Sequence, residues 1–304
     1  MIVSDHLPLK RIWPSVSRKL MYLLFFDLSI SLLYTFGGMK FLAISAFPLA
    51  PLVGAVSIFL AFRTQSAYGR WWEARILWGG LVNYSRTLTR QVITLIDGTP
   101  ETLSSPTDPR NQIVRLQIAF VCAFRCHLRR QNPFPELENL LDEDRVSRLR
   151  HHNNVPSALL LEAGSVLKQA KEDGRIDTFR WVTLDNSLTE LTNIFGSCER
   201  IKNTPLPRQY DYLPRIFVSA ICLLLPFSLV EGLELLTPIA STLISFILLA
   251  LDTVGREIES PFENTVHDTP MTSLSRSIEI NLRQQLGERR PSLREVHPVE
   301  GFIY

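Results

Sequence analysis

The sequence is poor in the residues and motifs from which most enzymes and metal sites are built. Its 304 residues include only four cysteines, none of them in a C-x-x-C pair. It contains no glycine-rich phosphate loop, no H-E-x-x-H and no G-x-S-x-G motif, which argues against the enzymes that these motifs mark. The formal net charge is only +2 and no basic stripe stands out, so nucleic acid is not an expected partner. We expect no enzyme activity and no cofactor.

The few thiols leave one candidate for metal binding. Cys122, Cys126 and His127 could lie on one surface of a helix and face a metal ion. No second ligand pair follows at the spacing of a zinc finger. The sequence therefore favours reduced thiols in the core of a cytosolic domain, and it predicts no metal site.

Long apolar runs, by contrast, occur towards both ends of the chain. A run of about 17–25 apolar residues can cross a bilayer as a helix. Four segments meet or approach this length, in two pairs that are each joined by a short turn. The predicted spans are Leu20–Phe36, Phe41–Phe62, Pro214–Val230 and Leu233–Leu251.

The charges that flank these runs predict their direction. Basic residues precede the first span and follow the second, whereas the short turns carry only Lys40. Because basic flanks stay in the cytoplasm, we expect a multi-pass protein of the cell inner (plasma) membrane with both termini cytoplasmic. The basic start also resembles a signal peptide, but a second span follows at once, which favours an uncleaved first span.

Between the two hairpins the sequence predicts a succession of helices. Apolar residues recur at helical spacing, the joints are rich in Gly, Pro, Asn and Asp, and no alternation typical of strands is sustained. The predicted helices are Trp71–Asp97, Asn111–Gln131, Pro135–Arg150, Pro156–Lys171 and Ile176–Asn203, with an amphipathic segment at Leu274–Leu286 in the tail. The first of these is apolar on more than one face, so we expect it to continue the second span into the centre of an all-α bundle.

Three charged residues in or near the predicted spans have structural interpretations. Asp27 lies inside the first span, where an acid is costly, and is expected to face a neighbouring helix or water. Asp252 and Arg256 have the spacing of an ion pair on one helix.

Three segments resemble the signature segments of the bestrophin family, in the same order and spacing. The first runs from Phe62 to Arg75 and contains Arg63, Arg70, Trp71, Trp72, Glu73 and Arg75. The second, Gly196–Pro207, leads into the third span. The third, Asp252–Phe262, follows the fourth span in the form seen in bacterial members.

The resemblance implies an ion channel: a homopentamer in the lipid bilayer, each subunit with four transmembrane helices and a helical cytoplasmic domain. Residues 1–62 would form the N-terminal segment and first hairpin, with the pore helix at 41–62. Residues 63–213 would form the helical cytoplasmic region, 214–255 the second hairpin, and 256–304 the cytoplasmic C-terminal segment.

The family's hydrophobic neck falls here on Gly54, Ile58 and Phe62, which share one helix face. Rings of Ile58 and Phe62 would form a narrow apolar constriction that stops ions by dewetting. Gly54 replaces a bulkier residue, which implies a wider outer neck. A second constriction, the cytoplasmic aperture, falls on Phe179. The alternative roles are helix packing for Ile58 and Phe62, and a core aromatic for Phe179.

The resemblance leaves the control and the selectivity of the channel open. Glu263 and Asp268 are too sparse to supply the six or more oxygens of a calcium site, so calcium control is not carried over. We expect permeating monovalent ions, with a lean towards sodium-like cations because the bacterial branch includes cation conductors. A chloride or other anion channel is the first alternative, and a non-conducting scaffold or a membrane-anchored enzyme is the second.

Overall fold

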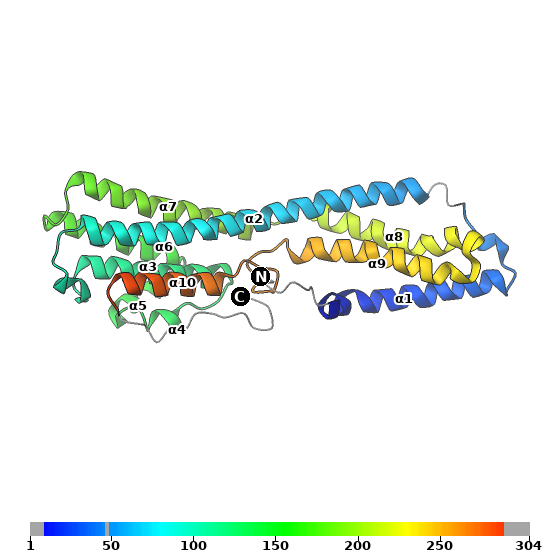
Figure 1. The fold of residues 1–304 in the computed structure, drawn as a ribbon, viewed down its shortest axis with the longest axis horizontal. Coiled ribbons are helices and arrows are strands. Elements are labelled where there is room, and N and C mark those ends of the chain that lie inside the picture. The colour runs from blue at the N-terminus through cyan, green and yellow to red at the C-terminus, as the bar shows by residue number, and fades with distance from the viewer. Residues whose placement is uncertain (1–8, 46–48, 289–304) are drawn as a thin grey trace. The chain divides into compact units, whose positions relative to one another are not determined.

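The computed structural model describes residues 9–45 and 49–288. All the regular elements in these residues are helices, which confirms the predicted all-α class. The chain divides into two compact units. Among the described residues, the first bundle comprises those up to Trp71 together with Pro205–Ser260, and the second comprises Trp72–Thr204 together with residues 261–288. Helix α2 (Leu49–Leu95) is continuous and contributes residues to both (Figure 1).

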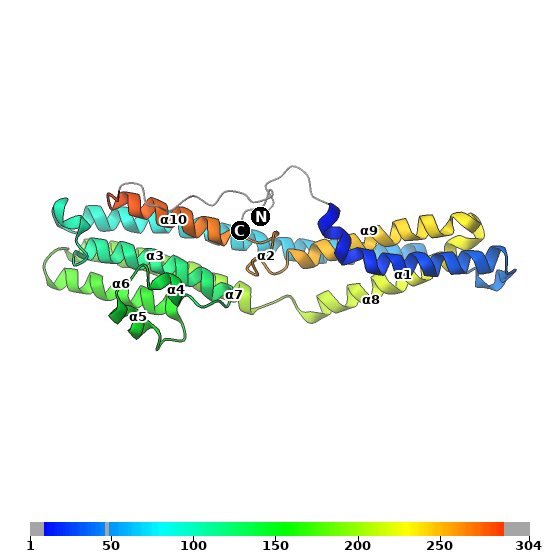
Figure 2. The same ribbon diagram turned by 90° about the horizontal axis from the view of Figure 1, so that it is seen from below.

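The first bundle consists of four helices that run side by side. They are α1 (Leu9–Thr35), the first part of α2, α8 (Arg208–Leu233) and α9 (Thr237–Glu257). The 3-10 helix η3 (Glu234–Leu236) joins α8 and α9 into a hairpin, and α1 packs along α9 (Figure 2). Another 3-10 helix, η1 (Lys40–Leu42), follows the turn after α1, where Gly38 has a φ of +67° that favours glycine.

Large apolar side chains cover the outside of the first bundle. Phe25, Leu32, Ile239, Leu243 and Ile247 are all exposed, as expected for helices that contact lipid. By length and composition the segments Leu49–Leu95 and Arg208–Glu257 can each cross a membrane, and the second segment contains both α8 and α9. The count of four spans stays a prediction.

Polar groups inside this bundle face one another. The Asp27 side chain is fully buried, and Thr242 Oγ1 of α9 donates to Asp27 Oδ2 at 3.2 Å. Ser31 Oγ donates to the Glu234 carbonyl at 2.8 Å. The prediction that Asp27 faces a neighbouring helix is confirmed, and these bonds connect α1 to the α8–α9 hairpin.

All four helices of the first bundle differ in extent from the apolar runs that predicted them; α9 extends from Thr237 to Glu257, where Leu233–Leu251 was expected. Helices α1 and α8 begin earlier, at Leu9 and Arg208, because a helix continues into polar residues beyond the run that hydropathy detects. Helix α2 begins at Leu49 and not at Phe41, the predicted start of the pore helix; residues 46–48 lie outside the described part. A start at Leu49 places Pro51 in the first turn, where its missing N–H costs no hydrogen bond.

The second bundle contains the rest of α2 and six further α-helices. These are α3 (Pro109–Leu128), α4 (Phe134–Leu137), α5 (Glu143–Leu149), α6 (Val155–Glu172), α7 (Thr178–Asn203) and α10 (Met271–Gln285). A 3-10 helix, η2 (Glu101–Ser104), precedes α3. The core is aromatic at its centre, where the Phe124 ring lies 5.4 Å from the Trp78 ring and 5.1 Å from the Phe195 ring. Trp78 is fully buried, as the apolar character of α2 predicts.

One predicted helix is wrong. The segment Pro135–Arg150 forms two short helices, α4 and α5, with a turn between them. Asp142 ends the turn, because its side chain accepts a hydrogen bond from the Arg145 N–H at 2.8 Å and so caps α5. The apolar spacing continues through the turn, since residues of both helices pack on the same core.

A buried ionic cluster fixes the joint between α2 and α3. Asp108 caps α3 by accepting from the Arg110 N–H at 2.9 Å, and its other oxygen lies 3.0 Å from Arg110 Nη2 and 3.1 Å from Arg175 Nη2. Gly98 is needed here, because a Cβ would lie 2.5 Å from Arg110 Nη2. Burial opposes the charge of Asp108, but the hydrogen bonds from Arg110 and Arg175 outweigh it and hold the pKa of this carboxyl well below its usual range.

Asp108→Asn should lower the free energy of unfolding by about 3 kcal/mol, because Arg110 would remain buried without its counter-charge. A carboxyl whose pKa is depressed by folding stabilises the protein fully above its ordinary pKa of about 3.9 and loses this effect as the pH falls through the folded-state pKa. The difference between wild type and variant in denaturant unfolding should therefore shrink below about pH 4.

Asp142 provides a matched control, because it also caps a helix but its side chain is 61% exposed. Asp142→Asn should change the unfolding free energy by less than about 1 kcal/mol, since Asn caps nearly as well as Asp. Equal losses in the two variants would contradict the role given to the buried charge.

Candidate functional site

Within the first bundle, one face of α2 is buried and packs against the other helices. Val56, Leu60, Arg63 and Ala67 recur at spacings of three and four residues and are all buried. Val56 and Leu60 share a core cluster with apolar residues of α8 and α9. This spacing is that of one helix face, so the packing sets which side of α2 turns inward.

The opposite face of α2 carries the predicted neck residues. Ile58 is 60% exposed and Phe62 is 65% exposed, and Gly54 one turn earlier is also exposed. No neighbouring atom lies within 4 Å of a Cβ built at Gly54. The three positions therefore form one uncharged strip on the surface of the subunit, and they are not core residues of the subunit.

The neighbour of Phe62 in the sequence is a deeply buried charge. Only 1% of Arg63 is exposed. Its Nη1 donates to Asp252 Oδ1 and its Nη2 to Asp211 Oδ1, both at 2.6 Å, and Glu259 Oε2 lies 3.6 Å from Nη2. A single guanidinium thus connects α2 to α8, to α9 and to the segment that follows α9.

Other arginines complete the charge balance of this cluster. Arg256 Nη2 lies 2.8 Å from Asp252 Oδ2, which confirms the predicted helix pair, and Arg215 Nη2 lies 3.0 Å from Asp211 Oδ2. Removing one partner of a buried ion pair costs about 3–5 kcal/mol, because the other charge is left uncompensated. Since successive helix residues point about 100° apart, burying Arg63 turns Phe62 outward.

The remaining signature residues connect α2 to several other elements. Arg70 Nε donates to the Glu259 carbonyl at 3.2 Å, and the Trp71 ring stacks on the Tyr68 ring at 5.9 Å. In the second bundle, Glu73 Oε1 accepts from Arg200 Nη2 at 2.6 Å. Trp72 is half exposed and Arg75 is partly buried. Most of the signature therefore stabilises the position of α2.

Phe179 lies in the first turn of α7, in the second bundle. Asp177 caps this helix, and the Phe179 side chain is 87% exposed. The alternative of a core aromatic is therefore wrong for the subunit, and the aperture role stays a prediction.

Sequence reasoning missed the partners of Arg63. Asp211 and Asp252 are separated from it by 148 and 189 residues, and no local spacing connects them. The sequence does contain one indication of this pairing. Arg63 and Asp252 each follow directly after an apolar run, where a charged side chain needs a partner.

The thiols that could have held a metal ion instead contact a cation. Arg125 Nη2 lies 3.8 Å from Cys122 Sγ and 3.7 Å from Cys126 Sγ, and Cys122 Sγ lies 2.7 Å from Glu136 Oε2. Burial raises the pKa of both thiols, against the opposing effect of Arg125. The pair therefore stays protonated, which does not favour metal coordination.

The acids after α9 are used in local contacts. Glu263 Oε1 accepts from Lys202 Nζ at 2.7 Å, and Asp268 Oδ2 accepts from the Thr265 N–H at 3.0 Å. Across residues 9–45 and 49–288, no group of three or more His, Cys, Asp or Glu side chains is placed to hold a metal ion.

Comparison with known proteins gives matches over most of the chain. Residues 8–284 match the family described as "Bacterial/Fungal Bestrophin protein". The chain is 36% identical over 274 residues to the "Voltage-dependent anion channel-forming protein YneE" of Salmonella typhi, covering 88% of this chain and 86% of that one. It is 35% identical over 253 residues to the "Voltage-dependent anion channel-forming protein RSc3414" of Ralstonia nicotianae, covering 83% and 80%.

A solved structure agrees with these relatives. The crystal structure of a bacterial bestrophin homologue from Klebsiella pneumoniae superposes with a TM-score of 0.83 at 31% identity, covering 90% of this chain and 100% of that one. The match of the family description, the sequence relatives and the fold extends over most of the chain, which therefore belongs to the bacterial and fungal bestrophin family.

Proposed function

We propose that this protein is a passive ion channel of the inner membrane, not an enzyme, whose pore is lined by the exposed strip of α2. The observation that carries the proposal is the exposure of Ile58 and Phe62 beside a buried Arg63. Apolar side chains on a subunit surface need a partner or a special environment. A central axis surrounded by copies of this strip would supply one.

The proposed assembly is a homopentamer with a shared water-filled path. Copies of one surface placed head to tail close into a ring around an axis. Rings of Ile58 and Phe62 would then meet the permeating ion inside the bilayer, and a narrow apolar ring stops ions by dewetting. At Gly54 the ring would be wider, and Phe179 would form a separate cytoplasmic aperture. Both termini would lie in the cytoplasm.

The proposed selectivity is for small monovalent anions such as chloride. Relatives at 36% and 35% identity carry names that refer to anions, which favours anions over the sodium-like cations that the sequence suggested. The strip itself is uncharged, so the preference would depend on charges along the rest of the path.

Phe62→Ala tests the neck directly. Shortening this side chain should widen the apolar ring and raise single-channel conductance or open time about twofold or more in planar bilayers. Phe25→Ala is the matched control, because Phe25 is 62% exposed on α1, away from the strip. Currents that respond equally to the two substitutions, or to neither, would mean that Phe62 does not line the path.

The mass of the purified protein in detergent tests the assembly. Native mass spectrometry should give one species of about 174 kDa, five times the 34.7 kDa of one chain. A stable monomer would be incompatible with a pore built from one strip of each subunit.

Reversal potentials test the selectivity. In reconstituted bilayers with a tenfold NaCl gradient, the zero-current voltage should move towards the chloride equilibrium potential, and replacement of chloride by a large organic anion should reduce the current. Replacing sodium by a large organic cation serves as the control and should leave the current nearly unchanged. A shift towards the sodium equilibrium potential would overturn the anion preference and leave the channel proposal intact.

A further inference from the structure

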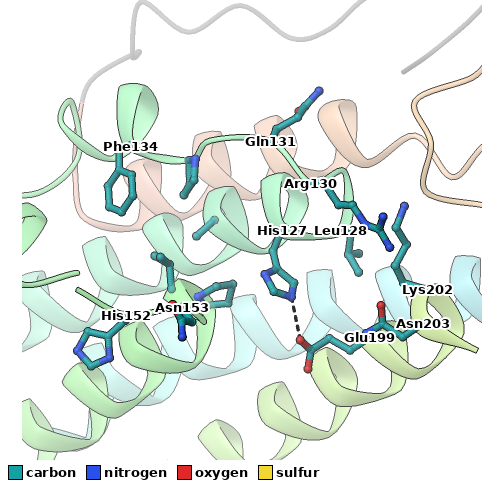
Figure 3. Close-up of a pocket in the computed structure, with 14 residues that line it drawn as sticks. His127, Leu128, Arg130, Gln131, Phe134, His152, Asn153, Glu199, Lys202 and Asn203 are labelled. Carbon is teal, nitrogen blue, oxygen red and sulfur yellow. Dashed lines mark hydrogen bonds and ion pairs between the residues drawn. The ribbon is translucent and has the colours of Figure 1, made fainter. Parts of the chain in front are cut away.

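A pocket of about 580 Å³ lies in the second bundle, among the C-terminal ends of α3 and α7 and the start of α6 (Figure 3). Small-molecule sites typically have volumes of about 300–1,000 Å³. His127 and Leu128 from α3, Glu199 from α7, and Val155 from α6 contribute to its wall. No signature segment accounts for this pocket as a whole, and no part of the proposed pore requires it.

One carboxylate organises the wall of the pocket. Glu199 Oε1 lies 2.8 Å from His127 Nε2 (Figure 3). It also accepts from Asn154 Nδ2 at 3.3 Å. Asn154 also caps α6, because its Oδ1 accepts from the Ser157 N–H at 3.1 Å. These contacts tie the ends of α3 and α7 to the start of α6, so the pocket is held open by a preformed network.

The lining carries more positive than negative charge. Its ionised groups are Arg130, Lys202 and Glu199, apart from its two histidines. Lys202 is paired with Glu263, since Lys202 Nζ lies 2.7 Å from Glu263 Oε1. Arg130 has no hydrogen-bonding or ion-pair partner for its side chain among the residues that the structure describes. Glu199 is held by His127 and Asn154, so Arg130 is the cation of this lining that is left to bind an anionic group.

The backbone holds Arg130 in an unfavourable conformation. Its φ is +55°, in the left-handed region that glycine or asparagine usually occupies after a helix. The Arg130 N–H donates to the His127 carbonyl at 3.0 Å, and the Gln131 N–H donates to the Cys126 carbonyl at 2.8 Å. These two bonds form a Schellman cap at the end of α3, which fixes the backbone of Arg130 at the edge of the pocket.

The other end of the pocket carries an aromatic ring. Phe134 and His152 lie at the opposite side of the view from Arg130 and Lys202 (Figure 3). The guanidinium carbon of Arg150 lies 4.5 Å from the centroid of the Phe134 ring, which fixes the ring in place. A ligand that fits both ends therefore has a charged head and an apolar body.

We propose that this pocket binds a small organic monocarboxylate with an apolar body. Its carboxylate is held by Arg130, and its apolar body lies against Phe134. The proposal goes beyond the proposed channel function, and binding is measured on the purified protein without any current.

Benzoate is a suitable probe for titration of the full-length protein in detergent by isothermal calorimetry. We expect saturable binding of benzoate, and at least about tenfold weaker binding of benzamide, which lacks the charge, and of acetate, which lacks the apolar body. Inorganic phosphate should not compete. Equal affinity for benzamide, or displacement of benzoate by phosphate, would overturn the assigned ligand class, as would no binding of benzoate.

Arg130→Gly separates ligand binding from folding. Glycine adopts a φ of +55° without strain, so this variant should have an equal or higher melting temperature and at least about tenfold weaker benzoate binding. Arg130→Asn is a second variant that removes the positive charge, in case the glycine variant is poorly folded. Asparagine also adopts the left-handed backbone conformation.

Arg148→Gln is the matched control, because Arg148 is a 60% exposed arginine on α5 that does not line the pocket. It should bind benzoate as wild type does. Unchanged affinity in the folded Arg130 variants, or the same loss in the Arg148 variant, would refute the role of Arg130.

Discussion

The buried guanidinium of Arg63 is the constraint on which the orientation of α2 depends. It contacts Asp252 of α9 and Asp211 of α8 at 2.6 Å each, while only 1% of its own surface is exposed. Apolar side chains lie on several sides of α2, so apolar burial alone does not define one inward face as sharply as a single apolar stripe would. A charge that has left water cannot be moved away from its partners without a cost of several kcal/mol. Arg63 therefore selects one rotation of α2, and that rotation determines which residues form the exposed strip.

The same helix meets two different packing requirements along its 47 residues. In the first bundle it buries a strip that includes Val56 and Leu60, and it leaves Ile58 and Phe62 exposed. In the second bundle its core residues include Trp78, whose ring stacks on Phe124. The signature residues Arg70 and Glu73 lie between these regions and hold the helix through Glu259 and Arg200. Each bundle therefore has its own signature residue that anchors α2.

The sequence predicted the helices and the signature better than it predicted their contacts. Helical spacing is a local property, and α7 begins and ends within two residues of its predicted limits. The break between α4 and α5 was missed, because residues of both short helices pack on one core and preserve the apolar spacing. The start of α2 was misplaced, because hydropathy does not separate the 3-10 helix η1, which lies inside the predicted run, from the helix that begins at Leu49. The pairing of Arg63 with Asp252 spans 189 residues, and the pocket beside Glu199 is formed by three helix ends, so neither could be read from local spacing.

The position of Arg63 next to Phe62 also bears on how the proposed neck would work. Dewetting requires a ring without charge, because one ionised side chain per subunit would hold water and counter-ions in the constriction. In the proposed ring, an Arg63 that faced the path would place five guanidinium groups one residue away from the Phe62 ring. The acids on α8 and α9 remove this possibility by neutralising Arg63 inside the subunit. The ionic cluster and the apolar strip therefore depend on each other. The cluster keeps the Arg63 charge buried inside the subunit, and the strip beside it stays uncharged as a result.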